Sequence, residues 1–130
     1  MERDFIPIKL ERNRYRKIYL NDIIYCKAER AYSKVKTVYS EFVYSKPLKE
    51  LSKLINSDTF VRVNRSFIVN MDKCLEIKIG LHPEIILEND IIIKPNISSL
   101  NELIKLFNIV SSEIEIEVSE IKTVDSEKEN

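Results

Sequence analysis

Short runs of β-branched and aromatic residues, separated by polar turns, dominate the pattern of this chain. Residues of this kind fit the pleated, half-buried surface of a sheet, and clusters of Asn, Asp and Ser between the runs favour turns. The pattern predicts strands at Phe5–Leu10, Tyr15–Leu20, Ile23–Cys26, Val35–Val38, Phe42–Tyr44, Phe60–Val63, Phe67–Val69, Cys74–Ile79, Ile85–Leu87 and Ile91–Lys94. The segment Glu29–Lys34 is polar and is predicted to be a loop between two of these strands.

Two segments have helical spacing instead. Pro47 suits the opening turn of a helix, and the apolar residues after it recur at helical intervals: Leu48, Leu51, Leu54 and Ile55. A second helix is predicted from Ser99, where Ser99-x-x-Glu102 has the form of a capping box and the apolar positions are Leu100, Leu103, Ile104 and Phe107. The sequence therefore predicts a mostly β (α+β) fold with short helices, the last of them near the C-terminal end of the folded body.

Gly80 is the only glycine in the chain, and it lies in a predicted turn that ends at Pro83. Glycine adopts positive φ without a steric cost. We therefore expect this turn to be the one place where the backbone needs positive φ.

The central stretch Phe60–Asn70 places polar side chains between two apolar strand segments. Arg62, Asn64, Arg65 and Ser66 carry donors that suit phosphate oxygens and base edges, and a turn between strands would hold them on a rigid support. An ordinary hairpin with a solvated tip would have the same pattern. Spacing alone leaves both interpretations open.

Composition and length indicate one domain without a membrane segment. The chain has 130 residues, of which 44% are hydrophobic, and it contains no uncharged apolar run of about 18 residues and no secretory signal pattern. We therefore expect a cytoplasmic protein. In that compartment the two isolated cysteines, Cys26 and Cys74, are expected to be reduced packing residues rather than a disulfide.

The net charge of zero hides two regions of opposite sign. Residues 111–130 hold seven acidic residues and two lysines, whereas the other 110 residues hold 19 basic and 14 acidic residues. Four of the six residues from Arg12 to Lys17 are basic, which fits either a phosphate clamp or a solvated hairpin end. A basic body favours a polyanionic partner such as nucleic acid.

Catalytic and metal-binding patterns are missing from the sequence. His82 is the only histidine, it precedes Pro83 in a predicted turn, and no acid or nucleophile stands at a recognised motif spacing. There is no glycine-rich phosphate loop and no C-x-x-C pair. We expect a protein that is not an enzyme and that uses no cofactor or metal.

Three segments together resemble the LytTR family of bacterial DNA-binding domains: Asp22–Tyr25, the leucine-spaced helix Leu48–Leu54, and above all Phe60–Asn70. The resemblance runs from about Phe5 to Asn108. It implies small antiparallel sheets with short helices, and DNA reading by loops inserted into successive major grooves. It also implies a division into a DNA-binding domain, residues 1–110, and an acidic extension, residues 111–130.

The resemblance puts DNA contacts in three loops: around Ser33 and Lys34, at Asn64 and Arg65, and around Asn96–Ser98. Arg65 is the strongest candidate, because its planar fork can engage guanine O6 and N7 together. Asn64 stands where the family usually has histidine; it could bond a base or tie the turn together. The third loop has Ser98 where family members often have basic residues, although a predicted helix N-terminus there favours a phosphate. The full set of candidate residues is Arg14, Arg30, Ser33, Lys34, Arg62, Asn64, Arg65, Asn96 and Ser98.

The function that follows is a sequence-specific transcription regulator bound to double-stranded DNA, without a receiver domain, and expected to occupy direct repeats. A homodimer and a regulatory protein partner are both compatible with this interpretation. The alternative is a protein-interaction module of the same fold with weakened DNA binding. In the extension, Glu113–Val118 alternates strictly between acidic and apolar residues, which predicts an edge strand ahead of a disordered tail. Such a strand could cover a sheet edge, pair with a second copy or compete with DNA.

Overall fold

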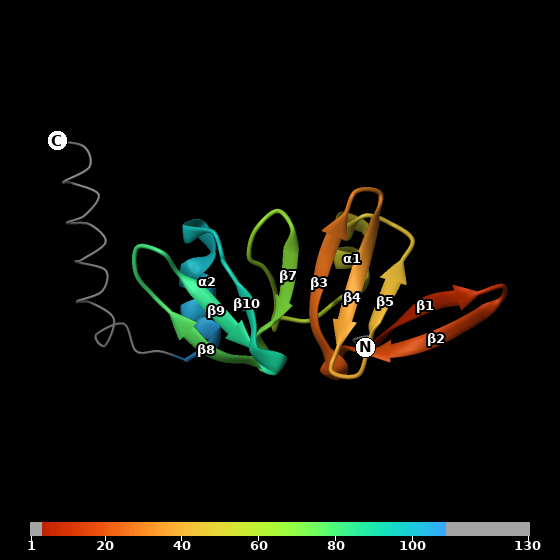
Figure 1. The fold of residues 1–130 in the computed structure, drawn as a ribbon, viewed down its shortest axis with the longest axis horizontal. Helices are drawn as coiled ribbons and strands as arrows, with labels where there is room; N and C mark the ends of the chain where they lie inside the picture. Colours follow the sequence, from red (N-terminus) through yellow and green to blue (C-terminus); the bar gives the residue numbers. More distant parts are fainter. Residues whose placement is uncertain (1–3, 109–130) are drawn as a thin grey trace. The chain divides into compact units, whose positions relative to one another are not determined.

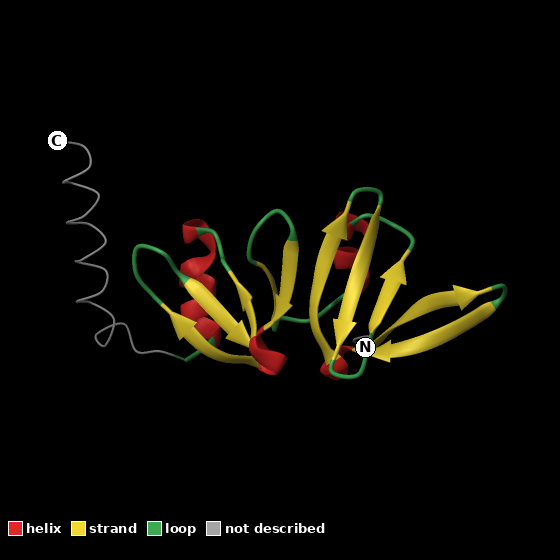
Figure 2. Cartoon of the chain, viewed as in Figure 1, coloured by secondary structure: helices red, strands yellow, loops and turns green. Residues whose placement is uncertain are grey.

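The computed structural model describes residues 4–108, and the chain divides into two compact units, residues 1–73 and residues 74–130. Each unit contains antiparallel strands joined by short turns (Figures 1 and 2). The units are described separately below.

The first unit combines a two-stranded hairpin with a five-stranded antiparallel sheet in the order β5-β4-β3-β7-β6. Strands β1 and β2 form the hairpin, and helix α1 follows β5 directly after Pro47. The bounds are β1 (Phe5–Glu11), β2 (Arg14–Tyr19), β3 (Ile23–Glu29), β4 (Tyr32–Thr37), β5 (Glu41–Tyr44), α1 (Leu48–Leu54), β6 (Phe60–Arg62) and β7 (Phe67–Asn70), with 3-10 turns η1 (Leu20–Asp22) and η2 (Met71–Lys73).

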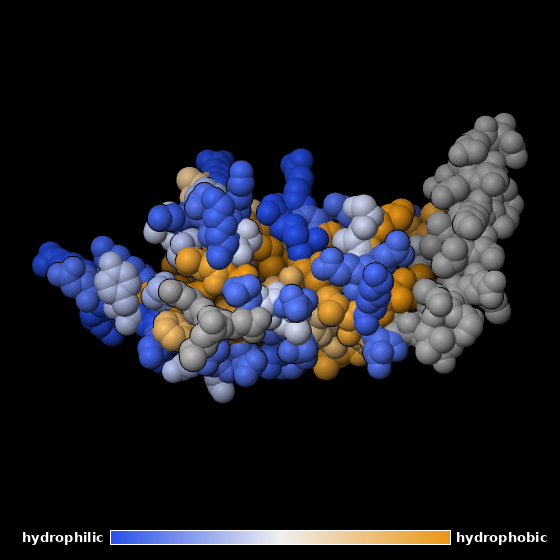
Figure 3. Space-filling model, turned by 180° about the vertical axis from the view of Figure 1, so that it is seen from behind, coloured by the Kyte–Doolittle hydropathy of each residue, from blue (hydrophilic) through white to orange (hydrophobic). Residues whose placement is uncertain are grey.

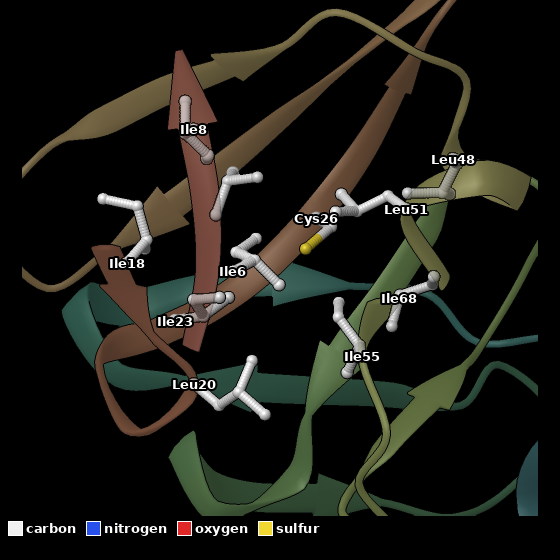
Figure 4. Close-up of a cluster of buried hydrophobic side chains, with 11 residues drawn as sticks. Ile6, Ile8, Ile18, Leu20, Ile23, Cys26, Leu48, Leu51, Ile55 and Ile68 are labelled. Atoms are coloured by element: carbon white, nitrogen blue, oxygen red, sulfur yellow. The ribbon is translucent and has the colours of Figure 1, made fainter. Parts of the chain in front are cut away.

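The core of the first unit lies between the hairpin, the larger sheet and α1 (Figure 4). Alternation along β1 puts Ile6 and Ile8 on one face, where they meet apolar side chains from β2, β3, β7 and α1. Each such side chain contributes about 1.5–3 kcal/mol by leaving water. The buried members of this cluster are Ile6, Ile8, Ile18, Leu20, Ile23, Cys26, Val35, Leu48, Leu51, Ile55 and Ile68.

Asn70, the last residue of β7, is a buried polar group inside this apolar environment. Its Nδ2 donates to the carbonyl oxygens of Leu20 at 3.3 Å and Ile23 at 2.9 Å, and its Oδ1 accepts the backbone N–H of Asp72 at 3.0 Å. One amide therefore ties the end of β7 to the start of β3. A buried amide with all these bonds made stabilises the fold, and losing it breaks three hydrogen bonds in the interior.

The second unit contains a three-stranded antiparallel sheet in the order β10-β9-β8 and a helix. Its elements are β8 (Cys74–Lys78), β9 (Glu84–Leu87), η3 (Glu88–Asp90), β10 (Ile91–Ile93), η4 (Ile97–Ser99) and α2 (Leu100–Leu106). Buried residues from the sheet and the helix form its interior: Ile85, Leu87, Ile93, Leu100 and Leu103.

The predicted fold class is confirmed: the described residues form small antiparallel sheets with short helices, the second of them near the end of the described range. Two local predictions were wrong. The segment predicted as a loop at Glu29–Lys34 is mostly strand, since β4 already begins at Tyr32. Ser99 makes no capping bond to α2, because its own φ and ψ of −91° and −9° are helical rather than the extended values of a capping residue, and its hydroxyl donates to the Asn96 carbonyl at 2.7 Å. The alternating segment Glu113–Val118 lies outside the described residues.

Positive φ is also more widespread than the single glycine suggested. Gly80 has a φ of 150°, as expected, but Asn13, Arg30, Asn89 and Asp90 have φ values of 48° to 66°. Asparagine and aspartate visit this left-handed region at a modest cost, because their short side chains bond locally. Arg30 has no short side chain of this kind, and it directly follows β3 in the turn to β4.

Both cysteines are free thiols in the structure, in agreement with the sequence. Cys26 is fully buried, and burial raises its pKa to about 12. Cys74 is half-buried, and burial raises its pKa as well. A thiol that stays protonated is a poor nucleophile, so Cys26 acts as an apolar packing residue.

The buried amide of Asn70 yields a stability prediction. Asn70→Ala should lower the free energy of unfolding by about 3 kcal/mol, because three hydrogen bonds of a buried amide are lost. Asn56→Ala is the matched control, since Asn56 is exposed, and it should change stability by less than about 0.5 kcal/mol. Urea denaturation followed by circular dichroism measures both. Equal midpoints for the two variants would contradict the role given to Asn70.

Candidate nucleic-acid interface

Three turns of the first unit lie together at one end of the strands of the five-stranded sheet, a row of strand ends here called the turn edge (Figure 1). Glu29 pairs with Tyr32 around the β3–β4 turn, Ser33 pairs with Tyr44 at the end of β5, and Lys27 pairs with Phe67 at the start of β7. A backbone hydrogen bond of 2.8 Å from Ala28 N–H to the Ser66 carbonyl joins two of these turns directly. The edge therefore carries residues 30–31, 45–47 and 64–66 side by side.

The turn between β6 and β7 is held by two side chains from the central stretch. Asn64 Oδ1 accepts the backbone N–H groups of Ser66 at 2.8 Å and Phe67 at 2.9 Å. Arg62 donates from Nε to the Asn64 carbonyl at 3.0 Å and from Nη2 to the Arg65 carbonyl at 2.6 Å. Of the two roles left open for Asn64, its Oδ1 therefore performs the one that ties the turn together.

These contacts separate the roles of the two arginines. The guanidinium of Arg62 donates to two backbone carbonyls of the turn, so it holds the turn in one conformation. Arg65 is exposed at the tip of the same turn. A rigid turn that presents an exposed guanidinium loses little conformational entropy when that group binds a ligand.

The turn between β3 and β4 presents Arg30 in the left-handed region, with a φ of 52°. This conformation costs a residue with a Cβ roughly 1–2 kcal/mol relative to glycine. The pairing of Glu29 with Tyr32 leaves only Arg30 and Ala31 to connect the strands, and that tight connection imposes the strain. Arg30 is exposed as a result. Strained residues of this kind cluster at functional sites.

The placement of Ser33 and Lys34 in a loop was wrong. Both lie in β4, Ser33 is fully buried, and its hydroxyl donates to the Lys46 carbonyl at 2.9 Å. Ser33 thus has no exposed surface for a ligand and instead holds the β5–α1 connection at the sheet edge. Lys46 itself is exposed there. It was not among the candidate residues, because its neighbours in the sequence form no pattern that indicates a binding site.

Lys34 lies among carboxylates. Its Nζ is 3.8 Å from Glu29 and 3.8 Å from Glu41, while Lys27 is 3.5 Å from Glu29. All four side chains are partly exposed, so each pair contributes little stability. The charges nevertheless nearly cancel along the strands. The exposed positive charge of this edge is concentrated in the turns, at Arg30, Lys46 and Arg65.

Arg14 lies at the start of β2, on the separate hairpin, and forms an ion pair with Glu11 across the tip. The neighbouring Arg12, Arg16 and Lys17 are exposed. The basic run predicted from the sequence therefore lies at an exposed hairpin end with one of its charges paired, and exposure fits both a phosphate clamp and a solvated end.

Asn96 and Ser98 belong to the second unit. Asn96 precedes the 3-10 turn Ile97–Ser99, both predicted residues are exposed, and the Asn96 carbonyl accepts the Ser99 backbone N–H at 3.0 Å. Ile97 between them is 61% exposed. The loop is ordered by its own backbone and has small polar side chains in place of a cation.

Groups suited to metal binding or catalysis do not cluster in the part of the chain that the structure describes. Residues 4–108 contain no group of three or more His, Cys, Asp or Glu side chains that could hold a metal ion. His82 is exposed in its turn. Within the same range no helix is long and apolar enough to cross a membrane.

Comparison with known proteins agrees with this geometry. Among solved structures, the chain matches the LytTr DNA-binding domain of a protein described as a methyl-accepting/DNA response regulator from Bacillus cereus, with 20% sequence identity and a TM-score of 0.66. That match covers 81% of this chain and 97% of the other, and it shows a shared fold. The comparison with curated proteins gives no match. A family model described as the LytTr DNA-binding domain matches residues 13–108, which is most of the chain. The chain therefore belongs to the family of LytTr DNA-binding domains.

Proposed function

We propose that this protein is a sequence-specific transcription regulator that reads the major groove of DNA with the turns at one edge of its five-stranded sheet. The observation that carries the proposal is the gathering of Arg30, Lys46 and Arg65, all exposed, on three adjacent turns. Membership of a DNA-binding family supports DNA as the partner. The family is not a catalytic one, and we assign no enzymatic activity.

Arg65 is the proposed base-reading residue. Its turn is fixed by Arg62 and Asn64, so its guanidinium is presented from a rigid support and can engage guanine O6 and N7 together. Arg62 and Asn64 are positioning residues in this scheme. Exposed Arg30 and Lys46 both lie on the β4–β5 side of Arg65 in the strand order, and they are assigned to the phosphates that flank the groove on that side.

The spacing of the turns supports insertion into one groove. The β3–β4 turn and the β6–β7 turn are centred two strand positions apart, which corresponds to about 10 Å at the usual strand separation. The major groove of DNA is about 12 Å wide. One turn can therefore enter the groove while its neighbour lies against the backbone that flanks it.

The second unit contributes a further proposed contact through Asn96 and Ser98. Asparagine can bond adenine, and a serine hydroxyl can bond a base or a phosphate. Because Asn96, Ile97 and Ser98 carry no charge, we assign these residues less of the electrostatic attraction than the turns of the first unit. We further propose that the protein acts in the cytoplasm and that two copies occupy direct repeats about one helical turn apart.

Binding should depend on salt through the two cations assigned to phosphates. If Arg30 and Lys46 each neutralise one phosphate, log K should fall against log salt with a slope of about −1.8 or steeper, and each substitution of these two residues to alanine should flatten it by about 0.9. Lys53→Ala is the control, because Lys53 already pairs with Glu50. Fluorescence anisotropy with a labelled duplex at several salt concentrations measures the slope. A slope that no turn substitution changes would refute the assignment of phosphate contacts.

Arg65 should determine preference at one base. Arg65→Ala should weaken binding to the preferred duplex by about 1–3 kcal/mol and equalise binding to duplexes that differ at that base. Arg65→Lys keeps the charge but loses the two-pronged geometry, so it should lose the preference while retaining most of the affinity for unrelated DNA. Competition binding with a duplex library measures both quantities. Unchanged base preference in Arg65→Lys would show that this side chain does not read a base.

Two substitutions of Arg30, in the strained β3–β4 turn, should distinguish its effect on stability from its effect on DNA binding. Arg30→Gly and Arg30→Ala both remove the charge, but only glycine relieves the left-handed strain, so the glycine variant should be more stable than the alanine variant by about 1 kcal/mol. Both should weaken DNA binding equally. Thermal or urea unfolding gives the stability difference and anisotropy gives the affinity. An alanine variant as stable as the glycine variant would contradict the strain.

A further inference from the structure

The outer edge of β2 is unpaired within the described residues. Strand β2 pairs with β1 on one side, and no other strand between residues 4 and 108 pairs with it. An edge strand presents a row of backbone N–H and C=O groups that can accept a further strand. Its side chains from Arg14 to Lys17 are all exposed, so nothing described covers this edge.

The two faces of β2 carry different chemistry beside that edge. Alternation puts Arg14 and Arg16 on one face and Tyr15, Lys17 and Tyr19 on the other. Tyr15 is 66% exposed and Tyr19 is 46% exposed. Figure 3 shows mainly hydrophilic side chains over the hairpin. A strand that docks here would meet two arginines on the face that continues to the buried Ile18, and two tyrosine rings with Lys17 between them on the other.

There is also open space beside the strand. A hollow of about 400 Å³ is lined by β2 and by the β4–β5 turn with its flanking residues. Its lining residues are Arg16, Lys17, Ile18, Tyr19, Asp22, Thr37, Tyr39, Ser40 and Phe42. The turn is fixed, because Thr37 Oγ1 accepts the backbone N–H groups of Tyr39 and Ser40. An extended segment can therefore approach the free edge without displacing the β4–β5 turn.

The chain itself contains a segment with the complementary pattern. Residues 113–118 read Glu-Ile-Glu-Ile-Glu-Val, and this run has six residues, the same length as β2. In extended form, one side would carry three carboxylates and the other three branched apolar side chains. The carboxylates suit the face with Arg14 and Arg16, and the apolar side suits the face with Tyr15 and Tyr19.

We propose that the free edge of β2 binds residues 113–118 of a second copy of this chain by strand addition. Backbone hydrogen bonds would supply the pairing, and the charges and apolar side chains would set the register. Only residues 109–112 separate the segment from the described end of the second unit, a reach of about 14 Å. When the segment comes from another copy, the pairing does not depend on how the two units of one chain are placed.

Such a contact joins two different surfaces: reciprocal exchange of the segment closes a symmetric pair, whereas one-way exchange places the copies head to tail. Head-to-tail copies face the same way, and this is the arrangement that direct repeats require. That consequence rests on the proposed function, whereas the docking itself does not. The tests below contain no DNA, so their failure would leave the DNA-binding proposal standing.

The test uses the full-length chain with proline at two positions. Ile116→Pro removes a backbone N–H within the alternating run and blocks its pairing as a strand, whereas the control Val124→Pro lies beyond the run. Sedimentation equilibrium over a range of concentrations should show self-association of the wild type and of Val124→Pro, and a mass of 15.3 kDa throughout for Ile116→Pro. A wild type that stays at this mass at all concentrations would overturn the proposal.

Hydrogen exchange identifies the surface. Amides of β2 should exchange about tenfold faster in Ile116→Pro than in the wild type, and wild-type protection should increase with concentration. Replacing Glu113, Glu115 and Glu117 together by glutamine should weaken self-association by about fivefold, as expected for exposed ion pairs with the two arginines Arg14 and Arg16. If Ile116→Pro removes the protection of the β2 amides but wild-type protection does not change with protein concentration, the segment binds its own chain. That result would overturn the second-copy assignment. Association without protection of β2 would overturn the assigned edge.

Discussion

Strand β3 is paired along both of its sides, and the candidate contacts of the first unit depend on that constraint. Because β4 lies on one side and β7 on the other, the turns that carry Arg30 and Arg65 must end at the same edge of the sheet. The two ends of the β3–β7 pair are fixed by polar groups: the Ala28 N–H bonds the Ser66 carbonyl at one end, and the buried Asn70 amide bonds Leu20 and Ile23 at the other. The sheet cannot slip without breaking both sets of bonds.

Much of the polar chemistry in the central stretch positions the backbone. Arg62 and Asn64 bond the turn, and Asn70 bonds the interior; of the two exposed arginines in that stretch, the Arg62 guanidinium is engaged with the turn backbone and Arg65 stands at the tip. Similarly, Glu29 and Glu41 lie close to Lys34 on the strands, so the exposed cations stand at the turns. Rigid turns with exposed cations over a nearly neutral sheet are suited to a ligand whose charge is arranged along a groove.

Element type could be predicted from the sequence because apolar residues here follow the period of strands and short helices closely. Ser33 was misplaced because the run Glu-Arg-Ala-Tyr-Ser-Lys is polar throughout, and a two-residue turn inside it is revealed only by the pairing of β3 with β4. Lys46 was missed for a related reason: it gains its place beside Arg30 from the pairing of β4 with β5. Asn64 had two chemically reasonable roles, and only the geometry of the turn separates them.

The central claim is that the edge formed by the three turns of the first unit is the surface that contacts DNA. The most direct measurement is a nuclear magnetic resonance titration of the labelled protein with a duplex that it binds. The account predicts that backbone shift changes concentrate at residues 30–31, 45–47 and 64–66, with a further set at residues 96–98. Changes confined to the opposite edge of the same sheet, at Asp22, residues 38–40 and residues 56–58, would contradict it.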